Sequence, residues 1–435
     1  MHYIAKLVDN LTFFNFYYMI ILVIIMEKIY KREDYLKKIR TFYNDYDLIK
    51  VITGIRRCGK SFFLKSVIEE LKELGIKDKD IIYLELDKKE HKDIDTPSKL
   101  EKLIDEKITD QDFKYLFIDE IQNVVGFEPL INSYREEKNM SIFITGSNSY
   151  LLSGELVTKL TGRYIEIEMM TLSFYEYVDM KRFLGKEVNE NIYIEFEEYI
   201  RNGGFPKSLY YDNYEDKILY TESVINQIFE KDIKTNNKIK DKDLFIRIEK
   251  YVINNFGARI STRNIYNYLK DVEKINIDRR TIERYLNILE NAKIIYPCEL
   301  FDMKSKEVLK GEKKYYLADL SIYYFLNTDN RINYGPVLEN IIYTYLKSKN
   351  YKLSVGRIGK LECDFIARLN YDDYYYIQVS KDISNKETEE REYKPFYMIK
   401  ELYPRYLFTM DLLLQKRDGI NHVNIVDFLY NNKTL

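Results

Sequence analysis

Residues 51–61 read Val51-Ile52-Thr53-Gly54-Ile55-Arg56-Arg57-Cys58-Gly59-Lys60-Ser61, a stretch that contains the pattern G-x-x-x-x-G-K-S in full. The mostly apolar residues 48–53 predict a buried strand before the pattern, and apolar residues recur at helical spacing over 62–74. A strand, a glycine-containing loop and a helix in this order are the context in which the pattern predicts a phosphate-binding loop, or P-loop. The alternative is a glycine turn that precedes a helix by chance.

The residue types in this loop suit a nucleoside triphosphate. Glycines at both ends let backbone N–H groups converge on phosphate oxygens, and the helix that begins near Lys60 adds the positive end of its dipole. We expect Lys60 to reach the β- and γ-phosphates and the Ser61 hydroxyl to bind Mg²⁺, so ATP and Mg²⁺ are the predicted ligand and cofactor. The predicted nucleotide-binding residues of the loop are Gly54, Ile55, Arg56, Arg57, Cys58, Gly59, Lys60, Ser61 and Phe62.

Length, charge and cysteine usage set outer limits on the function. The 435 residues have room for about three domains of ~150 residues. The formal net charge of −2 provides no overall electrostatic case for nucleic acid or membrane binding, so any basic surface must be local. Cys58, Cys298 and Cys363 lie far apart, which excludes a C-x-x-C pair and indicates neither a disulfide framework nor a zinc site. A reduced cytoplasm is the expected location.

The first 26 residues form an apolar extension. The run from Leu11 to Met26 is about sixteen residues long, short of the ~20 that a membrane-spanning helix needs. It also lacks the basic start and the small-residue cleavage site of a signal peptide. We interpret Met26 as the start of translation and residues 1–25 as an artefact of the gene model; a membrane or interfacial anchor is the alternative.

A second acidic motif follows the P-loop. Strands and helices alternate after the loop, which predicts a parallel α/β sheet. Lys114–Glu120 is an apolar strand that ends in two carboxylates. We expect Asp119 to hold the Mg²⁺ shell and Glu120 to polarise the attacking water as a general base. An ordinary strand followed by a polar turn is the alternative.

Three further residues are candidates for sensing the γ-phosphate. Ser147 and Asn148 follow a predicted strand over 141–145, and simple loop chemistry is the alternative for both. Arg163 precedes the predicted strand Tyr164–Ile167 and could act as an arginine finger, in its own subunit or in a neighbour's; action in its own subunit is the preferred interpretation. A structural ion pair is the alternative. Arg163, Lys60 and Glu120 make up the predicted catalytic set.

Several motifs together resemble one family, the prokaryotic AAA-type ATPases with a C-terminal domain of unknown function. They are the P-loop with Arg56-Arg57, the strand that ends in Asp119-Glu120, and the segments 144–149, 160–164, 172–176, 203–206 and 231–233. The resemblance covers most of the chain from about residue 27 onward. It implies a sheet like that of the archaeal ATPases, with an added strand and a catalytic glutamate.

The middle of the chain is expected to be helical and then winged-helix. Residues 171–244 predict a helical lid or linker, with a hinge at Gly203-Gly204. Residues 245–325 predict a winged-helix domain with a charged wing over 304–312. Its second helix would carry basic side chains into a DNA groove; they are Arg279, Arg280 and Arg284. The nearby acids Asp278, Glu283 and Glu290 nearly cancel that charge, so a protein-contact or scaffold role is the alternative.

Residues 326–435 resemble the restriction-endonuclease-like PD-(D/E)xK core. Glu339, Asp364 and Gln378 stand at its metal-binding positions. Gln378 replaces the second carboxylate of the pattern and Ser380 replaces its lysine, while the adjacent Lys381 would point to the opposite face of the strand. We interpret this as a degenerate nuclease fold without cleavage activity.

The sequence therefore predicts an α/β protein with four parts after the extension. A P-loop NTPase parallel-sheet core (27–170) precedes a helical lid or linker (171–244), a winged-helix domain (245–325) and a restriction-endonuclease-like domain (326–435). The predicted function is Mg²⁺-dependent ATP hydrolysis coupled to a C-terminal effector and an unidentified protein partner. The alternatives are a slow ATP-gated interaction switch and a DNA-binding or nuclease-like regulator.

Overall fold

Five short apolar segments form a parallel sheet in the N-terminal part of the chain. The computed structural model describes residues 28–146, 162–234, 239–327 and 331–435. The strands are β1 (Ile49–Thr53), β2 (Ile81–Glu85), β3 (Lys114–Asp119), β4 (Met140–Thr145) and β5 (Tyr164–Glu168). Their order is β2-β3-β4-β1-β5, and every pairing is parallel. β4 therefore lies between the strand before the P-loop and the strand that ends in Asp119, as the family resemblance implied.

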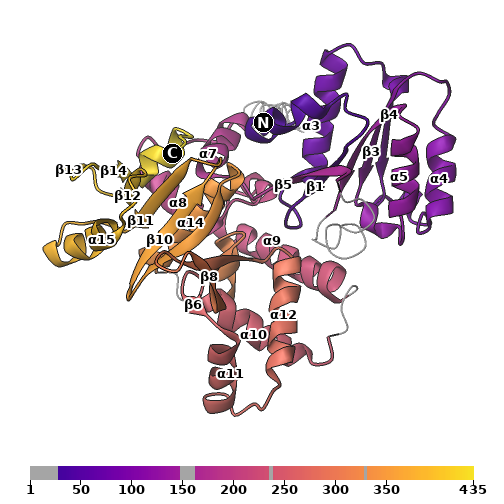
Figure 1. Ribbon diagram of the computed structural model, residues 1–435. Helices are drawn as coiled ribbons and strands as arrows, with labels where there is room; N and C mark the ends of the chain where they lie inside the picture. The colour runs from indigo at the N-terminus through magenta and orange to yellow at the C-terminus, as the bar shows by residue number, and fades with distance from the viewer. Residues whose placement is uncertain (1–27, 147–161, 235–238, 328–330) are drawn as a thin grey trace, which may run out of the picture.

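Helices cover both faces of this sheet (Figure 1). They are α2 (Glu33–Ile39) and α3 (Lys60–Glu73) on one side and α4 (Pro97–Asp105) and α5 (Glu128–Glu136) on the other. β3 shows how the sequence directs this packing: Tyr115 and Phe117 pack with α3, whereas Leu116 and Ile118 pack with α4 and α5. All six residues of β3 are buried, which explains why it reads as a continuous apolar run.

A helical connection leads away from the core. It consists of α7 (Phe174–Phe183), α8 (Ile192–Asn202), the 3-10 turn η6 (Pro206–Tyr210), α9 (Tyr214–Gln227) and a π-helix (Ile228–Lys234). α7 begins at a capping box in which the Ser173 hydroxyl accepts from the Glu176 backbone N–H, and the Glu176 carboxylate accepts from the Ser173 backbone N–H. Most of the described residues between 174 and 234 are therefore helical, in line with the helical character expected of 171–244.

Hydrogen bonds to two distant parts of the chain hold the paired glycines between α8 and η6 in place. The Gly204 carbonyl accepts from the Leu172 N–H at 2.7 Å, and the Gly204 N–H donates to Asp319 Oδ2 at 2.8 Å. Gly203 has φ 70° and ψ −170°, a conformation open to glycine almost alone. A Cβ on Gly203 would lie 1.8 Å from Asp319 Oδ1. The expected hinge is therefore an anchor between the core and the chain near residue 319.

The C-terminal part contains a nine-stranded mixed sheet. Its order is β13-β14-β12-β11-β10-β9-β7-β8-β6. The strands are β6 (Arg259–Ile260), β7 (Ile295–Asp302), β8 (Glu307–Leu317), β9 (Lys352–Ile358), β10 (Leu361–Arg368), β11 (Tyr374–Val379), β12 (Arg405–Thr409), β13 (Lys416–Arg417) and β14 (Ile420–Asn424). Because β7 pairs in parallel with β9, one sheet crosses the domain boundary expected at residue 325.

Seven helices accompany this sheet in the described residues. They are α10 (Lys242–Asn254), α11 (Thr262–Asp271), α12 (Arg279–Asn291), α13 (Ser321–Leu326), α14 (Tyr334–Ser348), α15 (Lys386–Met398) and α16 (Ile425–Tyr430). The segment predicted as a charged wing, 304–312, lies mostly within β8, so the turn of the β7–β8 hairpin is confined to 303–306. Within the described ranges, no helix combines the length and the apolar character needed to cross a bilayer.

The anchor at Gly203 leads to a stability prediction. Gly203→Ala should lower the free energy of unfolding by about 1–3 kcal/mol more than Gly185→Ala does, because the added Cβ collides with the buried Asp319 carboxylate. Gly185 is the control because its φ is also positive, at 69°, and nothing lies within 4 Å of its added Cβ. Urea unfolding of both variants measures the difference. Equal losses would show that Asp319 is not packed tightly against Gly203.

Candidate nucleotide-binding site

The P-loop joins the carboxyl end of β1 to the N-terminus of α3. Gly54 comes directly after β1 and has φ 140°; a Cβ there would lie 2.2 Å from the Met169 carbonyl oxygen. The loop can therefore follow this path only with glycine at its first position. Gly59 precedes α3, and no side chain caps the first N–H groups of that helix. Uncapped N–H groups at a helix N-terminus form an anion site.

A buried arginine holds the outer side of the loop in place. Arg32 donates to the Cys58 carbonyl at 3.2 Å and to the Met170 carbonyl at 2.7 Å. It also forms a two-pronged pair with the Glu176 carboxylate, at 2.8 and 2.7 Å. Cys58 is fully buried beneath this contact, consistent with a small filler rather than a reactive thiol. Arg32 thus joins the loop to the segment 170–176.

Lys60 lies along the loop that precedes it. Its ammonium donates to the Gly54 carbonyl at 2.9 Å and to the Ile55 carbonyl at 3.2 Å, and the residue is only 4 % exposed. These neutral acceptors are weaker partners for an ammonium than phosphate oxygens are. Ser61 is half-buried next to Lys60, and Phe62 is exposed.

The two arginines of the loop differ sharply. Arg56 is buried and pairs with both carboxylate oxygens of Asp232 in the π-helix, at 2.8 and 2.9 Å. Burial alone would lower the pKa of Arg56, but Asp232 raises it, so the guanidinium stays charged. Arg57 is exposed, and its guanidinium reaches Gln227 Oε1 at 3.2 Å. The sequence pattern did not distinguish the two.

The two carboxylates at the end of β3 share one partner. Thr145, at the end of the neighbouring β4, donates its hydroxyl proton to Asp119 Oδ1 at 2.5 Å and accepts from the Glu120 N–H at 3.0 Å. Glu120 adopts φ 61°, and the Gln122 side chain donates to its carboxylate. Sequence reasoning missed Thr145, although its place at the end of a strand beside β3 was a usable signal.

The electrostatic setting of Glu120 suits a base. Burial raises the pKa of Glu120, whereas the nearby Lys60 and Arg56 cations oppose that rise and Asp119 adds to it. A buried carboxylate near two cations and a second carboxylate is the kind of group that active sites employ for proton transfer. Lys60 and Arg56 are therefore charged neighbours of Glu120 near the carboxyl edge of the sheet.

The structure does not bring Arg163 to this edge. Arg163 precedes β5, whose first residue, Tyr164, pairs with Ile49 at the start of β1. The P-loop follows the other end of β1, roughly 15 Å away at ~3.3 Å per residue. Arg163 is instead exposed and lies 3.2 Å from Asn132 Oδ1. A role in its own subunit's site, the preferred interpretation, is therefore wrong for this arrangement, and action in a neighbour's site stays a prediction.

The remaining predicted sensors, Ser147 and Asn148, lie outside the described residues. The residues that are described fit a nucleotide with its metal ion. The uncapped N-terminus of α3 and Lys60 suit phosphate oxygens, and the Ser61 hydroxyl with the Asp119 carboxylate supplies the oxygen ligands that Mg²⁺ prefers.

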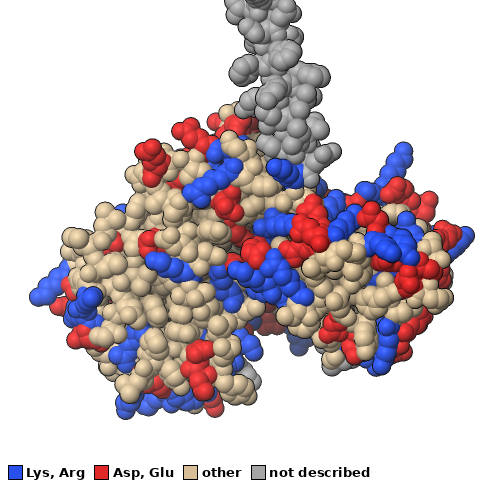
Figure 2. All heavy atoms as spheres, turned by 90° about the horizontal axis from the view of Figure 1, so that it is seen from above, with Lys and Arg blue, Asp and Glu red and all other residues tan. Residues whose placement is uncertain are grey.

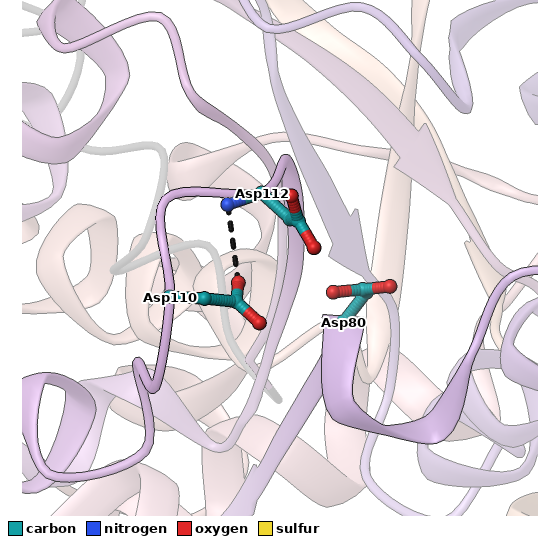
Figure 3. Close-up of side chains that lie close together, drawn as sticks. All are labelled: Asp80, Asp110 and Asp112. Carbon is teal, nitrogen blue, oxygen red and sulfur yellow. Dashed lines mark hydrogen bonds between the residues drawn. The ribbon is translucent and has the colours of Figure 1, made fainter.

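A separate acidic cluster lies at the opposite edge of the sheet. Figure 3 shows Asp80 before β2 close to Asp110 and Asp112 before β3. Lysines neutralise it: Lys79 binds Asp110 and Asp112 at 2.8 and 2.7 Å, and Lys114 binds Asp80 and Asp110 at 2.7 and 2.5 Å. The cluster is an ion-pair network that links the segment before β2 to the segment before β3.

In the C-terminal part, the structure brings Asp364 and Gln378 together on neighbouring strands. The Asp364 N–H donates to Gln378 Oε1 at 2.8 Å, and the Val379 N–H donates to Asp364 Oδ2 at 2.8 Å. The Gln378 amide also donates to Glu392 Oε2 at 3.0 Å. A carboxylate at 378 could not donate this bond, which gives a physical reason for glutamine there. Both side chains line a cleft of about 550 Å³.

Glu339 lies on the same cleft but is already paired. Lys314 of β8 contacts Glu339 Oε2 at 2.8 Å and Glu362 Oε1 at 2.6 Å, and the Tyr316 hydroxyl donates to Glu339 at 2.9 Å. Burial would lower the pKa of Lys314, but the surrounding carboxylates raise it, so the ammonium stays charged. Burial raises the pKa of Asp364 well above its usual value. The Lys314 ammonium thus neutralises the carboxylates of Glu339 and Glu362 on this side of the cleft.

Family models match two parts of the chain. A model described as an AAA domain matches residues 46–178, and a model described as a domain of unknown function (DUF8612) matches residues 193–332. An uncharacterized protein of Haemophilus influenzae is 34% identical over 405 residues, which cover 92% of this chain and 98% of that protein. The chain therefore belongs to the family of this Haemophilus influenzae protein, and its P-loop sheet is an AAA-type ATPase fold.

More distant similarities extend across the chain. Uncharacterized protein MJ1544 of Methanocaldococcus jannaschii is 29% identical over 362 residues, which cover 80% of this chain and 78% of that protein. The Walker-type ATPase of Pyrococcus abyssi is a solved structure with a TM-score of 0.49 and 15% identity, covering 69% of this chain and 96% of that one. The Aeropyrum pernix ORC2 protein has a TM-score of 0.39 and 11% identity, over 72% and 92% of the two chains. Both TM-scores lie below 0.5, so the assignment rests on the family match and the strand order.

The geometry at Glu120 generates a kinetic prediction. Glu120→Gln keeps the shape of the side chain but cannot accept a proton, so it should slow ATP hydrolysis by ~10²-fold or more and leave MgATP affinity nearly unchanged. Because burial raises the pKa of Glu120, the parent rate should begin to fall at a higher pH than an exposed glutamate would give. Glu101→Gln, on the exposed face of α4, is the control. A matching loss of affinity would assign Glu120 to structure or metal binding.

Proposed function

We propose that this protein binds MgATP at the P-loop, hydrolyses it, and passes the nucleotide state to its C-terminal elements. The observation that carries the proposal is the convergence of Lys60, at the start of α3, with Asp119 and Glu120, at the end of β3, at one edge of a parallel sheet beside an uncapped helix N-terminus. A strand order with β4 between β1 and β3 supports it, because this order separates Lys60 and Glu120 by the space of one strand.

Each residue has a chemical part in the proposed reaction. When nucleotide binds, Lys60 exchanges its two carbonyl partners for phosphate oxygens. The charged phosphate oxygens are stronger partners for the ammonium, so this exchange contributes to the binding energy of the nucleotide. Glu120 accepts a proton from the attacking water, and Thr145 fixes its backbone. Ser61 and Asp119 would hold Mg²⁺, which supplies charge neutralisation on the phosphates when bound.

Contacts around the P-loop support coupling to the rest of the chain. Pro206 lies within 3.7 Å of where a Cβ on Gly59 would be, Asp232 binds Arg56, and Gly204 joins Asp319. A change at the phosphates would therefore reach η6 and the π-helix directly. If turnover is slow, the same contacts make an ATP-gated switch, in which the bound state carries the function.

The proposed function is tested with Lys60→Ala. Loss of the ammonium should abolish hydrolysis and weaken ATP binding, while the thermal unfolding temperature stays close to that of the parent. Lys65→Ala, which removes a half-exposed lysine of the same helix, should retain activity. Release of phosphate from ATP with Mg²⁺ is the measurement, and binding to a fluorescent ATP analogue is the second readout. Parent-like hydrolysis by Lys60→Ala would overturn the P-loop assignment.

A second candidate function, DNA binding, is favoured by the surface of α12. The order α10, β6, α11, α12, β7 and β8, with β6 paired to β8, supports the predicted winged helix. Arg279, Arg280 and Arg284 are exposed, and none of them forms an ion pair within the described residues. Two of the nearby acids have hydrogen-bond partners of their own: Asp278 accepts from the Arg280 backbone N–H at the start of α12, and Glu290 accepts from the Tyr315 hydroxyl.

Charge elsewhere on the surface does not add to this local patch. Figure 2 shows that basic and acidic side chains are interspersed on the face seen from above. With a net charge of −2, any DNA contact must come from a small number of side chains, and it should weaken steeply as salt increases.

Exchanging charge on α12 tests the second candidate. The double variant Arg280→Glu/Arg284→Glu should reduce binding to duplex DNA by at least ~10-fold at low salt, because a phosphate that is no longer neutralised by the protein keeps its counterions. Lys102→Glu/Lys107→Glu, in α4 and just after it, makes the same charge change on another surface and should have little effect. Fluorescence anisotropy across a salt series measures both. If both double variants weakened DNA binding equally, the binding would reflect only the overall charge of the protein and not a site on α12.

A further inference from the structure

The P-loop contains a buried arginine, Arg56. A γ-phosphate in transfer is stabilised when a fixed cation meets the charge on its oxygens. Arg163 lies at the far edge of the sheet, about one strand length from the loop. Arg56, in contrast, is part of the loop and is only 7 % exposed.

The surroundings of Arg56 point toward the hydrolytic side of the pocket. Its guanidinium interacts electrostatically with Asp232 first and then with Glu120 and Asp87. Glu120, in turn, is influenced by Lys60 and Arg56. Arg56 therefore has both Asp232, which it contacts directly, and the predicted general base Glu120 among its charged neighbours.

Asp232 is placed to hold this arginine in one orientation. Its two carboxylate oxygens engage Nε and Nη2 of Arg56 at 2.9 and 2.8 Å, a bidentate geometry that fixes the plane of the guanidinium. Asp232 itself is 5 % exposed and belongs to the π-helix, a strained form that recurs at functional sites. Lys231, next to it, reaches Asp87 at 3.3 Å and fixes the same turn to the core.

We propose that Arg56 is a catalytic residue that stabilises the γ-phosphate within its own subunit, and that Asp232 is the residue that positions it. The proposal rests on the proposed ATPase function. It assigns to the loop the task that sequence reasoning gave to Arg163. It also makes the π-helix the first element to sense whether a γ-phosphate is present, because Asp232 shares Arg56 with that phosphate.

The step that Arg56 serves is the transfer of the γ-phosphoryl group to water. The water oxygen bonds to the γ-phosphorus, and the bond from that phosphorus to the β–γ bridging oxygen breaks. The electron pair of the broken bond stays on the ADP oxygen, and the proton of the water passes to Glu120, which leaves ADP and inorganic phosphate. Arg56 balances the negative charge that the separating phosphoryl and ADP oxygens carry.

The test compares Arg56→Lys with Arg259→Lys. Arg56→Lys keeps the charge and an ion pair with Asp232 but loses the bidentate fork, so it should fold and yet turn over at least ~10²-fold more slowly. Arg259, in the C-terminal sheet, also pairs with a carboxylate: its Nε and Nη2 both contact Glu362 Oε2, at 2.7 and 2.6 Å, and its variant should hydrolyse ATP at the parent rate.

A binding readout separates catalysis from folding. Aluminium fluoride with ADP mimics the phosphoryl group in transfer, so the parent should bind this mixture more tightly than ADP alone. Arg56→Lys should lose most of that gain while its affinity for ADP stays within about threefold of the parent. Asp232→Asn should show the same pattern with a lowered kcat, and Asp232→Glu should recover part of it.

The outcomes are distinct. Parent-like turnover and a parent-like gain from aluminium fluoride in both Arg56→Lys and Asp232→Asn would overturn the proposal. If Lys60→Ala is inactive in the same assay, the ATPase function survives that result and only the arginine assignment fails. If Lys60→Ala hydrolyses ATP normally, the proposed function fails first.

Discussion

A parallel sheet brings the carboxyl ends of all its strands to one edge, and this constraint decides which residues of the chain can act together. The P-loop follows β1, Asp119 and Glu120 stand at the end of β3, and Thr145 ends β4 between them. Because the order β3-β4-β1 is fixed by buried apolar pairings, the three functional segments meet without any direct sequence link. The same rule places Asp80, Asp110 and Arg163 at the other edge, away from the loop.

The second layer of organisation is the set of buried polar contacts that join the core to the rest of the chain. Arg32 holds the P-loop to the segment after β5, and Asp232 holds Arg56. The Gly204–Asp319 bond continues the same path to the end of β8. Removing one partner of a buried ionic contact leaves the other unpaired and costs several kcal/mol, roughly 3–5. These contacts therefore make the helical connection part of the nucleotide site rather than a free linker.

Sequence reasoning was most successful where the signal was local. Residues close together in the sequence were enough to predict the P-loop, the apolar strands and the carboxylates at the end of β3. The structure brings these features together. The errors concern positions that depend on distant pairings. Arg163 was assigned by its place before a strand, although a residue at that end of a parallel strand faces away from the loop. The Arg56–Asp232 pair spans 176 positions, and Lys314 of β8 reaches Glu339 of helix α14. No periodicity or spacing in the chain indicates such contacts.

The central claim is that a nucleotide at the P-loop is sensed by the π-helix through contacts already present at the loop. Hydrogen exchange of backbone amides in the Glu120→Gln protein, with MgATP compared to MgADP, tests this most directly. The variant is chosen because it should hydrolyse ATP too slowly to convert the ATP-bound sample into the ADP-bound one. We expect protection of residues 54–62 by both nucleotides and a difference between ATP and ADP at residues 227–234. Protection confined to 54–62 with both nucleotides, and no change at 227–234, would contradict the claim.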